Sequence, residues 1–502
     1  MREYRKILRN RKARIERRLN PEKRWSDQPS PMLSGRNISY EMSEKAEAIT
    51  CGGIGAIHQM VQKIGLTGEI DRRLELLQVH LPYHESDHVL NLCYNVLVGG
   101  KCLEDIELRR QDATFLKALG AQRIPDPTTS GDYTRCFKHP AQVETLMDCI
   151  NVSRQVVWKH SRRAPFKSAL IDVDGTLAPT YGECKQGMEY SYKGVWGYHP
   201  LIVSLANTGE VLTLVNRPAN AVSHEGAAER IDDAIALVTP HSERICLRGD
   251  TDFYLTGQFD RWSDQVDFVF GTDAQQNLVR IAEGLKKQAW KRLRRKPKYV
   301  IATRKRDRPE NVKEQIVRER EFKNIRLVSE HVAAVPYRPG KCEETYRLVI
   351  VRKNLSIEKG EATLFPDLRY FFYITTLKDR TAAKVVELAN GRCDQENVIE
   401  QLKNGVNAMR VPVDNLLSNW AYTVMTALAW NLKAWFSMLL PNRKRGTQLL
   451  EKEFRYFLNV IVRIPCQIIW KGRRIIYRVL GYNPWLSDFF STWERIRRLK
   501  PI

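Results

Sequence analysis

Two apolar runs that end on acidic residues constrain the fold of this chain more than any other feature. SALIDVDGT leads into Asp172 and Asp174, and ERICLRGDTDF leads into Asp250 and Asp252. Short apolar runs bounded by turn residues are typical of buried strands. An acid at the end of a buried strand is held rigidly, and acids from neighbouring strands can meet at one edge of a sheet. The pattern predicts an α/β fold with carboxylates gathered at that edge.

A third acidic position lies in RCDQENVIEQLKNG, residues 392–405, which is typical of the first turns of a helix. Arg392, Glu396 and Lys403 are spaced by four and seven, so that they share one face of an α-helix. Two acids from strand ends and one from a helix can bridge two divalent cations about 3.5–4 Å apart. Mg²⁺ suits such a site, because it needs few carboxylates and keeps room for waters and phosphate oxygens. The same stripe is also common on surface helices as i,i+4 ion pairs.

The order of elements around these acids is also informative. Residues 165–285 read as a strand, a hairpin around YSYKGVWGYHPLIVSLANTGEVLTLV, the helix HEGAAERIDDAIALV and two more strands. Three antiparallel strands followed by helix-linked strands are the order of an RNase H-like domain. Asp250 and Glu396 are 146 residues apart, more than a minimal core needs. The excess contains β-like runs, namely HVAAVPYR, EETYRLVIVRK and YFFYITTL.

Together these segments resemble the catalytic core of a bacterial insertion-sequence transposase of the DDE type, which has an RNase H-like fold. The resemblance extends from about residue 45 to the end of the chain and includes VLVGGKCLEDIELRR and LSNWAYTVMTALAWNLKAW. The β-like runs before the glutamate resemble the β-rich insertion that some of these transposases carry. The motifs are Asp-Gly-Thr at 174–176, Arg-Gly-Asp-Thr-Asp-Phe at 248–253 and Arg-x3-Glu-x6-Lys at 392–403.

The resemblance implies specific roles. Asp174, Asp250 and Glu396 are expected to be catalytic and to bind two Mg²⁺ ions, with Mn²⁺ as a substitute. Arg392 and Lys403 are expected to contact DNA phosphates. The implied activity is DNA cleavage followed by joining of the 3′ hydroxyl ends to target DNA. The implied partners are the element's terminal inverted repeats, target DNA and a second copy of the chain in the synaptic complex.

Some details depart from this pattern or leave it open. Related transposases often have Tyr three residues before the Arg, where this chain has Ala389, which puts any contact from that side chain in doubt. Asp172 and Asp252 are expected to support the site, but either remains an alternative ligand. Alternation along a strand places Asp172 on the same face as Asp174.

The charge of the chain predicts a polyanionic partner. Its 81 Lys and Arg residues exceed its 58 Asp and Glu residues, which gives a net charge of +23. Residues 1–24 alone hold eleven basic and three acidic side chains. With no signal peptide or lipidation motif in the sequence, nucleic acid is a better partner than a membrane surface. We expect a cytoplasmic, nucleoid-associated bacterial protein.

Three further patterns have simple explanations. The apolar stretch at 419–440 contains Asn419, Asn431 and Lys433, so it predicts a buried helix rather than a membrane span. The ten Cys residues include no CxxC pair, which fits a reducing compartment. HLPYHESDH at 80–88 has three His residues, but Pro82 interrupts it. This cluster predicts a loop with Ser86 or Asp87 capping the next helix in preference to a zinc site.

Composition and periodicity divide the chain into six predicted segments. Apolar spacing at 45–160 is mostly helical, which fits either a helix-turn-helix unit or a plain helical bundle. The segments are a basic flexible arm at 1–40, a helical DNA-binding domain at 41–162, the first part of the RNase H-like core at 163–285, a basic and β-rich insertion at 286–377, the second part of the core with the glutamate helix at 378–440, and a basic helical C-terminal region at 441–502.

Two other functions remain open from the sequence. IDVDGTL matches the first motif of haloacid-dehalogenase-type phosphatases, in which Asp172 would be the nucleophile and Asp174 the acid/base. That interpretation leaves the charge and the run at 392–403 unexplained. A non-catalytic DNA-binding protein derived from a transposase is the second alternative, although all three acids are intact.

Overall fold

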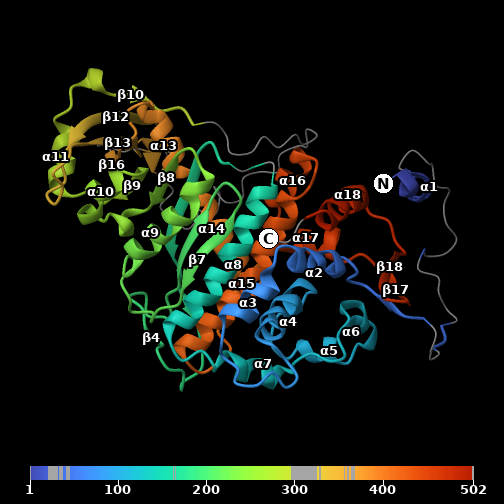
Figure 1. Cartoon of the computed structure of the whole chain (residues 1–502). Coiled ribbons are helices and arrows are strands. Elements are labelled where there is room, and N and C mark those ends of the chain that lie inside the picture. The colour runs from blue at the N-terminus through green and yellow to red at the C-terminus, as the bar shows by residue number, and fades with distance from the viewer. Residues whose placement is uncertain are drawn as a thin grey trace.

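A nine-stranded mixed sheet organises the molecule in the computed structural model (Figure 1). The structure describes residues 2–20, 32, 38–40, 46–161, 163, 165–295, 325–326, 329–355, 357–358, 361–362 and 368–499. The strand order is β10-β12-β13-β16-β9-β8-β2-β6-β7. The five core strands are β2 (Ala169–Gly175), β6 (Leu201–Leu205), β7 (Glu210–Val215), β8 (Ile245–Gly249) and β9 (Asp267–Thr272).

The core strands have the predicted RNase H-like arrangement. β2, β6 and β7 are antiparallel neighbours, and β8 and β9 run parallel to β2 on its other side. The helices that follow β7, β8 and β9 are α9 (Ala227–Val238), α10 (Thr256–Ser263) and α11 (Gln276–Glu283). The predicted fold class, a mixed sheet flanked by helices, is therefore confirmed. A small sheet after β2 contains β3 (Ala178–Pro179), β4 (Glu189–Tyr190) and β5 (Trp196–Tyr198).

The predicted insertion is not a separate sheet. Its strands β10 (Lys291–Arg292), β12 (Ser329–Tyr337), β13 (Tyr346–Asn354) and β16 (Leu368–Thr375) extend the core sheet, because β16 pairs antiparallel with β9. Both faces are covered. α13 (Ala382–Asn390) packs on Val349 and Val351, and α11 packs on Leu348 and Ile350. β11 (Ile325–Arg326), β14 (Ile357–Glu358) and β15 (Glu361–Ala362) form a further small sheet. Most of the basic stretch at 286–323 lies outside the described residues.

Helices from both ends of the chain enclose the rest of the core. α8 and α15 lie side by side through the centre of the molecule, and α3 and α4 pack against them (Figure 1). The N-terminus of α7 (Pro127–Thr134) is capped, because Asp126 Oδ1 accepts the Thr129 amide and Pro127 occupies the first turn. The N-terminal elements are β1 (Ala48–Ile49), α2 (Ile54–Lys63), α3 (Leu66–Arg73), α4 (Glu85–Leu97), α5 (Ile106–Arg110), α6 (Ala113–Leu119), α7 (Pro127–Thr134) and α8 (Pro140–His160).

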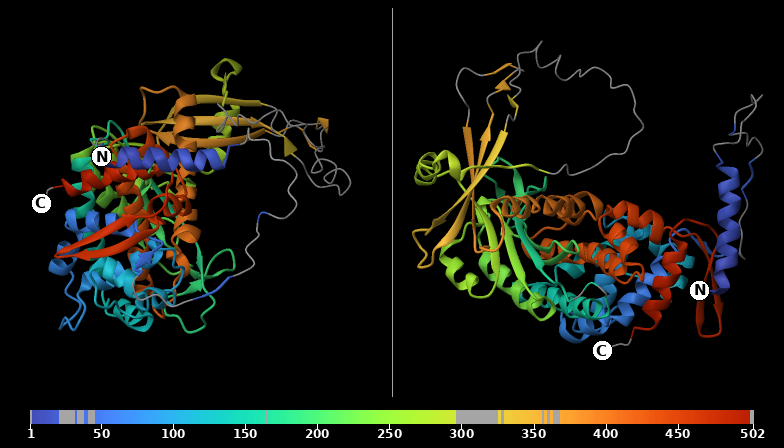
Figure 2. Two further views of the ribbon diagram at one scale, coloured as in Figure 1. Left: turned by 90° about the vertical axis from the view of Figure 1, so that its right-hand side faces the viewer. Right: turned by 90° about the horizontal axis from the view of Figure 1, so that it is seen from above.

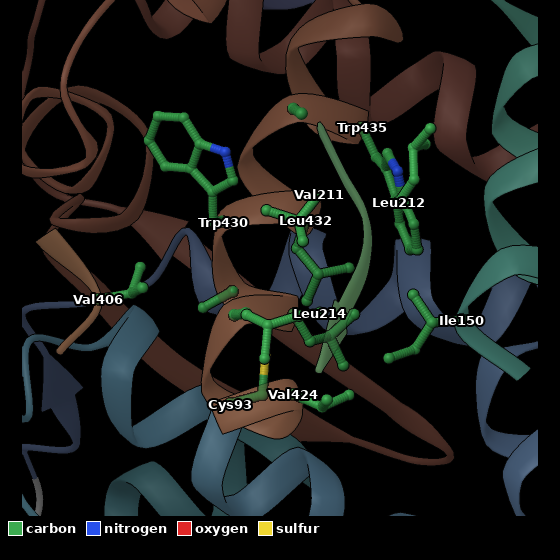
Figure 3. Close-up of a cluster of buried hydrophobic side chains, with 14 of the residues drawn as sticks. Cys93, Ile150, Val211, Leu212, Leu214, Val406, Val424, Trp430, Leu432 and Trp435 are labelled. Carbon is green, nitrogen blue, oxygen red and sulfur yellow. The ribbon is translucent and has the colours of Figure 1, made fainter. Parts of the chain in front are cut away.

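The long apolar helix α15 (Leu416–Met438) is the centre of the core. Its Trp430, Leu432 and Trp435 lie against Val211 and Leu212 of β7 (Figure 3). Trp435 Nε1 donates to the buried Glu210 carboxylate at 2.7 Å, so its polar atom is satisfied. None of the helices in the described parts of the chain is long and apolar enough to span a bilayer.

The C-terminal region contains the predicted helices and, in addition, one β-hairpin. The helices are α16 (Arg443–Leu450), α17 (Phe454–Phe457) and α18 (Leu486–Arg497), and the hairpin consists of β17 (Cys466–Lys471) and β18 (Arg474–Val479). β17 also pairs with β1, so the two ends of the chain share a sheet. The pairing partner lies more than 400 residues away in sequence, where local periodicity gives no signal.

The predicted flexible arm is partly a regular helix. α1 (Arg2–Arg18) lies beside the β17–β18 hairpin, at the edge of the molecule (Figure 2). Tyr4 stacks on Phe490 with ring centroids 4.8 Å apart, and Arg11 Nη1 donates to the Val479 carbonyl at 3.1 Å. The basic side chains of α1 are mostly exposed.

Candidate active site

Asp174 and Asp250 share one arginine partner at the edge of the sheet. Asp174 lies near the end of β2, and Asp250 directly follows β8. Arg392 Nη1 is 2.8 Å from Oδ2 of Asp174 and 3.7 Å from Oδ2 of Asp250. Carboxylates that approach the same nitrogen atom must lie close to each other. The structure therefore brings these two predicted site residues together.

Glu396 comes to the same place on a separate helix. It lies in the first turn of α14 (Cys393–Glu400), and Arg392 is the residue that precedes this helix. Burial would lower the pKa of Arg392, but Asp174, Asp250, Cys393 and Glu396 together raise it. The Glu396 carboxylate thus belongs to the same electrostatic cluster, although it is exposed. The three carboxylates do not all lie within 4.8 Å of one another, and Arg392 stands between the two aspartates.

The helix carrying Glu396 is anchored on the sheet by its neighbour. Gln395 is 1% exposed, and its Nε2 donates to the backbone carbonyls of Asp172 at 3.2 Å and Ile202 at 3.1 Å. These bonds fix α14 across β2 and β6. Gln395 points inward, whereas its neighbour Glu396 is exposed. Sequence reasoning gave Gln395 no role, since a single buried amide inside a polar run has no distinctive pattern.

Asp172 has a different environment from Asp174. It is fully buried, and Arg248 on β8 donates to both of its oxygens, at 2.6 and 2.7 Å. Arg248 Nη1 also donates to the Leu388 carbonyl at the end of α13. A side chain at Gly391 would meet this guanidinium at 2.5 Å, so the chain can turn here only at a glycine. The sequence signal for Arg248 was a charge inside an apolar strand, which requires a buried partner.

Lys403 does not share the α-helical face of Arg392 and Glu396. Residues Gln401–Gly405 form a π-helix, in which hydrogen bonds span five residues instead of four. The wider turn breaks the spacing argument after Glu400. Lys403 is half-buried, and burial lowers its pKa while Glu400 acts in the opposite direction. The prediction that all three residues share one face was wrong for this residue.

The carboxylates of Asp174, Asp250 and Glu396 carry more negative charge than the one guanidinium of Arg392 can neutralise. Burial, opposed by Arg392 and reinforced by Asp250, raises the pKa of Asp174 to about 6. Burial also raises the pKa of Asp250, with Arg392 opposing and Asp252 adding to the shift. A divalent cation would relieve this repulsion. Oxygen ligands of this kind are those that Mg²⁺ and Mn²⁺ prefer, so the donor set fits the predicted ions.

A cleft adjoins the acids on the side of Asp252. It has a volume of about 1010 Å³ and is lined by Tyr192, His199, Tyr254 and Lys341 among others. Asp252 lies in the short 3₁₀ turn Thr251–Phe253, and its backbone amide donates to Oδ1 of Asp250 at 3.1 Å. Asp252 thus orients Asp250 through its backbone, while its side chain lines the cleft.

A comparison with protein families assigns the chain to a family. The family model for the transposase DDE domain, group 1, matches residues 34–501. The chain belongs to this family. No curated protein matches the chain. Among solved structures, it is similar to a piggyBac transposase in a synaptic complex with hairpin DNA, determined by cryo-electron microscopy. That similarity has a TM-score of 0.37 and 10% identity, and it covers 82% of this chain and 81% of the other.

Proposed function

We propose that this DDE-family chain is an active insertion-sequence transposase that cleaves the ends of its element and joins the 3′ hydroxyl ends to target DNA. The observation that carries the proposal is the shared contact of Arg392 with Asp174 and Asp250, at the first turn of the helix bearing Glu396. Two acids from strand ends and one from a helix are the donors that a two-cation phosphoryl-transfer site requires.

In the proposed mechanism, Asp174, Asp250 and Glu396 would hold two Mg²⁺ ions. Bound ions would supply activation of the attacking water or hydroxyl and stabilisation of the leaving 3′ oxygen. The chain's own residues position these groups. Gln395 and Arg248 keep α14 and α13 fixed on the sheet, so the three carboxylates keep their relative positions.

Arg392 has two successive roles in this proposal. Without metal it is the counterion of Asp174 and Asp250, which would otherwise repel each other. With these carboxylates engaged by metal, the Arg392 guanidinium would be free to bind a DNA phosphate beside the scissile bond. A guanidinium suits both roles, because its fork of donors matches carboxylate and phosphate oxygens.

The decisive experiment is an assay with DNA that carries the inverted repeats flanking the gene. The purified chain should cut this DNA in the presence of Mg²⁺ or Mn²⁺ and join the ends to a plasmid. Glu396→Gln should bind the same DNA without cutting it. If the wild-type chain binds these ends but never cuts them with either ion, the proposal fails and the non-catalytic DNA-binding alternative holds.

The DNA partner can be tested separately by salt dependence. Each phosphate contact contributes roughly −0.9 to the slope of log affinity against log salt. Deleting residues 1–24, which include the exposed basic helix α1, should flatten this slope and weaken binding while leaving metal-dependent cleavage. An affinity that does not change between about 50 and 200 mM salt would contradict the assignment of the charge to DNA.

The environment of Asp172 argues against the phosphatase alternative. A nucleophilic aspartate must reach its substrate, but Asp172 is fully buried and both of its oxygens are bound by Arg248. Releasing Asp172 from Arg248 would leave unpaired charges buried inside the sheet. Loss of DNA cleavage in Asp172→Asn with full thermal stability would revive that alternative.

A further inference from the structure

Three side chains of metal-binding type converge where the loop after α3 meets the start of α4. One ligand atom from each of His80, His84 and Glu85 lies within 4.8 Å of the other two. Among the residues that the structure describes, this is the one such group of three or more. His80 Nε2 is 2.9 Å from Oε2 of Glu85, and the His80 and His84 rings stack with centroids 4.3 Å apart. The cluster shares no residue with the proposed catalytic site.

Glu85 is held in place as a ligand would be. Its side chain is 2% exposed, and its Oε1 accepts the backbone amides of Leu77 at 3.0 Å and Leu76 at 3.3 Å. Burial alone would raise its pKa, but these amides, its own amide and His80 lower the pKa overall. One oxygen is bound to backbone, and the other faces the histidines. Hydrogen bonds of this kind commonly orient carboxylates that bind metals.

The two histidines complete a donor set open to solvent. Both side chains are exposed, while the His84 backbone is fixed at the start of α4 by a 2.9 Å hydrogen bond from its amide to Asp87 Oδ2. Ligand atoms around tetrahedral zinc are about 3.4 Å apart, and those of His80, His84 and Glu85 already lie within 4.8 Å of one another, so only a small shift of the His84 ring is needed. An exposed ring can make this movement by side-chain rotation alone.

We propose that His80, His84 and Glu85 bind one divalent cation of the zinc class, with a water in the fourth position. Two imidazole nitrogens and one carboxylate are ligands that favour Zn²⁺ over Mg²⁺. The ion would tie the loop at 74–84 to α4, which packs against the central helix α15. It would stabilise the helical region and take no part in strand transfer.

The test is zinc titration of the full-length chain by calorimetry, in excess Mg²⁺ so that the catalytic acids are saturated. The wild-type chain should bind one Zn²⁺. His80→Asn, His84→Asn and Glu85→Gln should each weaken zinc binding by at least roughly tenfold. Asn is chosen at position 84 because it also caps helices well, so that α4 is preserved. Glu75→Gln is the matched control. It makes the same charge change as Glu85→Gln at an exposed position of the loop at 74–84, and it should bind zinc as the wild type does.

Thermal melting gives an independent measurement. Zinc should raise the melting temperature of the wild type and of Glu75→Gln, but not that of His84→Asn. Without metal, His84→Asn and the wild type should melt together, which shows that the variant is folded. If the wild type binds no zinc under these conditions, or if His84→Asn binds it as tightly as the wild type, the site does not exist.

Discussion

Asp172 and Asp174 lie two residues apart on the same strand, and each is paired with an arginine, yet they have opposite characters. Asp172 is bound through both oxygens by Arg248, and the two side chains are 1% and 4% exposed. Asp174 is bound through one oxygen by Arg392, and the side chains are 17% and 18% exposed. The first pair is saturated. In the second pair the other oxygen of Asp174 accepts only the Gly175 amide, at 2.8 Å, and the pair has a second carboxylate nearby and a route to solvent.

This difference follows from depth in the sheet, and it supports the proposal that Asp174 and not Asp172 takes part in the chemistry. Asp172 lies opposite Arg248 in the parallel register of β2 and β8, so its partner comes from the neighbouring strand. Asp174 lies beyond the last residue of β2 that pairs with β8, so its partner must come from a helix. A partner outside the sheet can be exchanged for a cation without breaking strand pairing. The four predictions below test this distinction.

The largest effect is expected for the acids at the open edge. Asp174→Asn, Asp250→Asn and Glu396→Gln should each lower the rate of DNA end cleavage at least about a thousandfold, or ~4 kcal/mol in activation free energy. Melting temperatures should hardly change, because these side chains are partly exposed. Asp252→Asn is the control and should lose less than about tenfold. If Asp252→Asn loses more cleavage activity than Asp250→Asn, the metal ligand is Asp252 and not Asp250.

The buried pair should show the reverse behaviour. Asp172→Asn should lower the free energy of unfolding by about 3 kcal/mol, because Arg248 is left buried without a counterion. Denaturant unfolding followed by tryptophan fluorescence measures this change. The double variant Asp172→Leu with Arg248→Met should recover most of the stability, since it leaves no charge unpaired. A double variant as unstable as the single one would show that the pair has another role.

Lys433 extends the comparison to a buried cation that has no carboxylate partner among the residues that the structure describes. Its Nζ donates to the Leu450 carbonyl at 2.8 Å and lies 3.8 Å from the Trp430 ring centre, and burial lowers its pKa to about 7. Between about pH 7 and pH 10 the unfolded chain binds a proton that the folded chain does not, so this lysine makes stability rise with pH.

Lys433→Met should therefore stabilise the chain most at or below pH 7. The gain should shrink by about 2 kcal/mol between pH 7 and pH 9, where the folded wild type already holds a neutral lysine. Melting temperatures of the wild type and of Lys433→Met at pH 7 and pH 9 measure this change in the stability gain. A difference between the chains that stays constant with pH would mean that Lys433 keeps its proton when folded.

The smallest effect is expected for the cations assigned to DNA. Arg392→Ala and Lys403→Ala should each weaken binding to the element's ends about fivefold, or ~1 kcal/mol, and change stability by less than about 1 kcal/mol. Lys384→Ala, on the exposed side of α13, is the control and should leave binding unchanged. A large drop in melting temperature with intact DNA binding would make Arg392 a purely structural ion-pair partner.

Much of the fold was predictable because its signals are local. The runs ending at Asp174 and Asp250 gave the strands, and their order with the helix at 227–238 gave the RNase H-like core. The cap at Asp126 and the buried helix at 416–438 were predictable for the same reason. Backbone periodicity and capping chemistry depend on residues close in sequence.

The sequence by itself determined which residue types meet at the sheet edge, and the tertiary structure decided how they are paired. The π-helix at 401–405 turned Lys403 off the expected face, and the pairing of β16 with β9 merged the insertion into the core sheet. The Arg248–Asp172 pair and the convergence of His80 with Glu85 were likewise settled only in three dimensions. The first three depend on strand register and helix geometry, which contacts between segments far apart in the chain determine. The last depends on the path of a loop, which has no periodic sequence pattern.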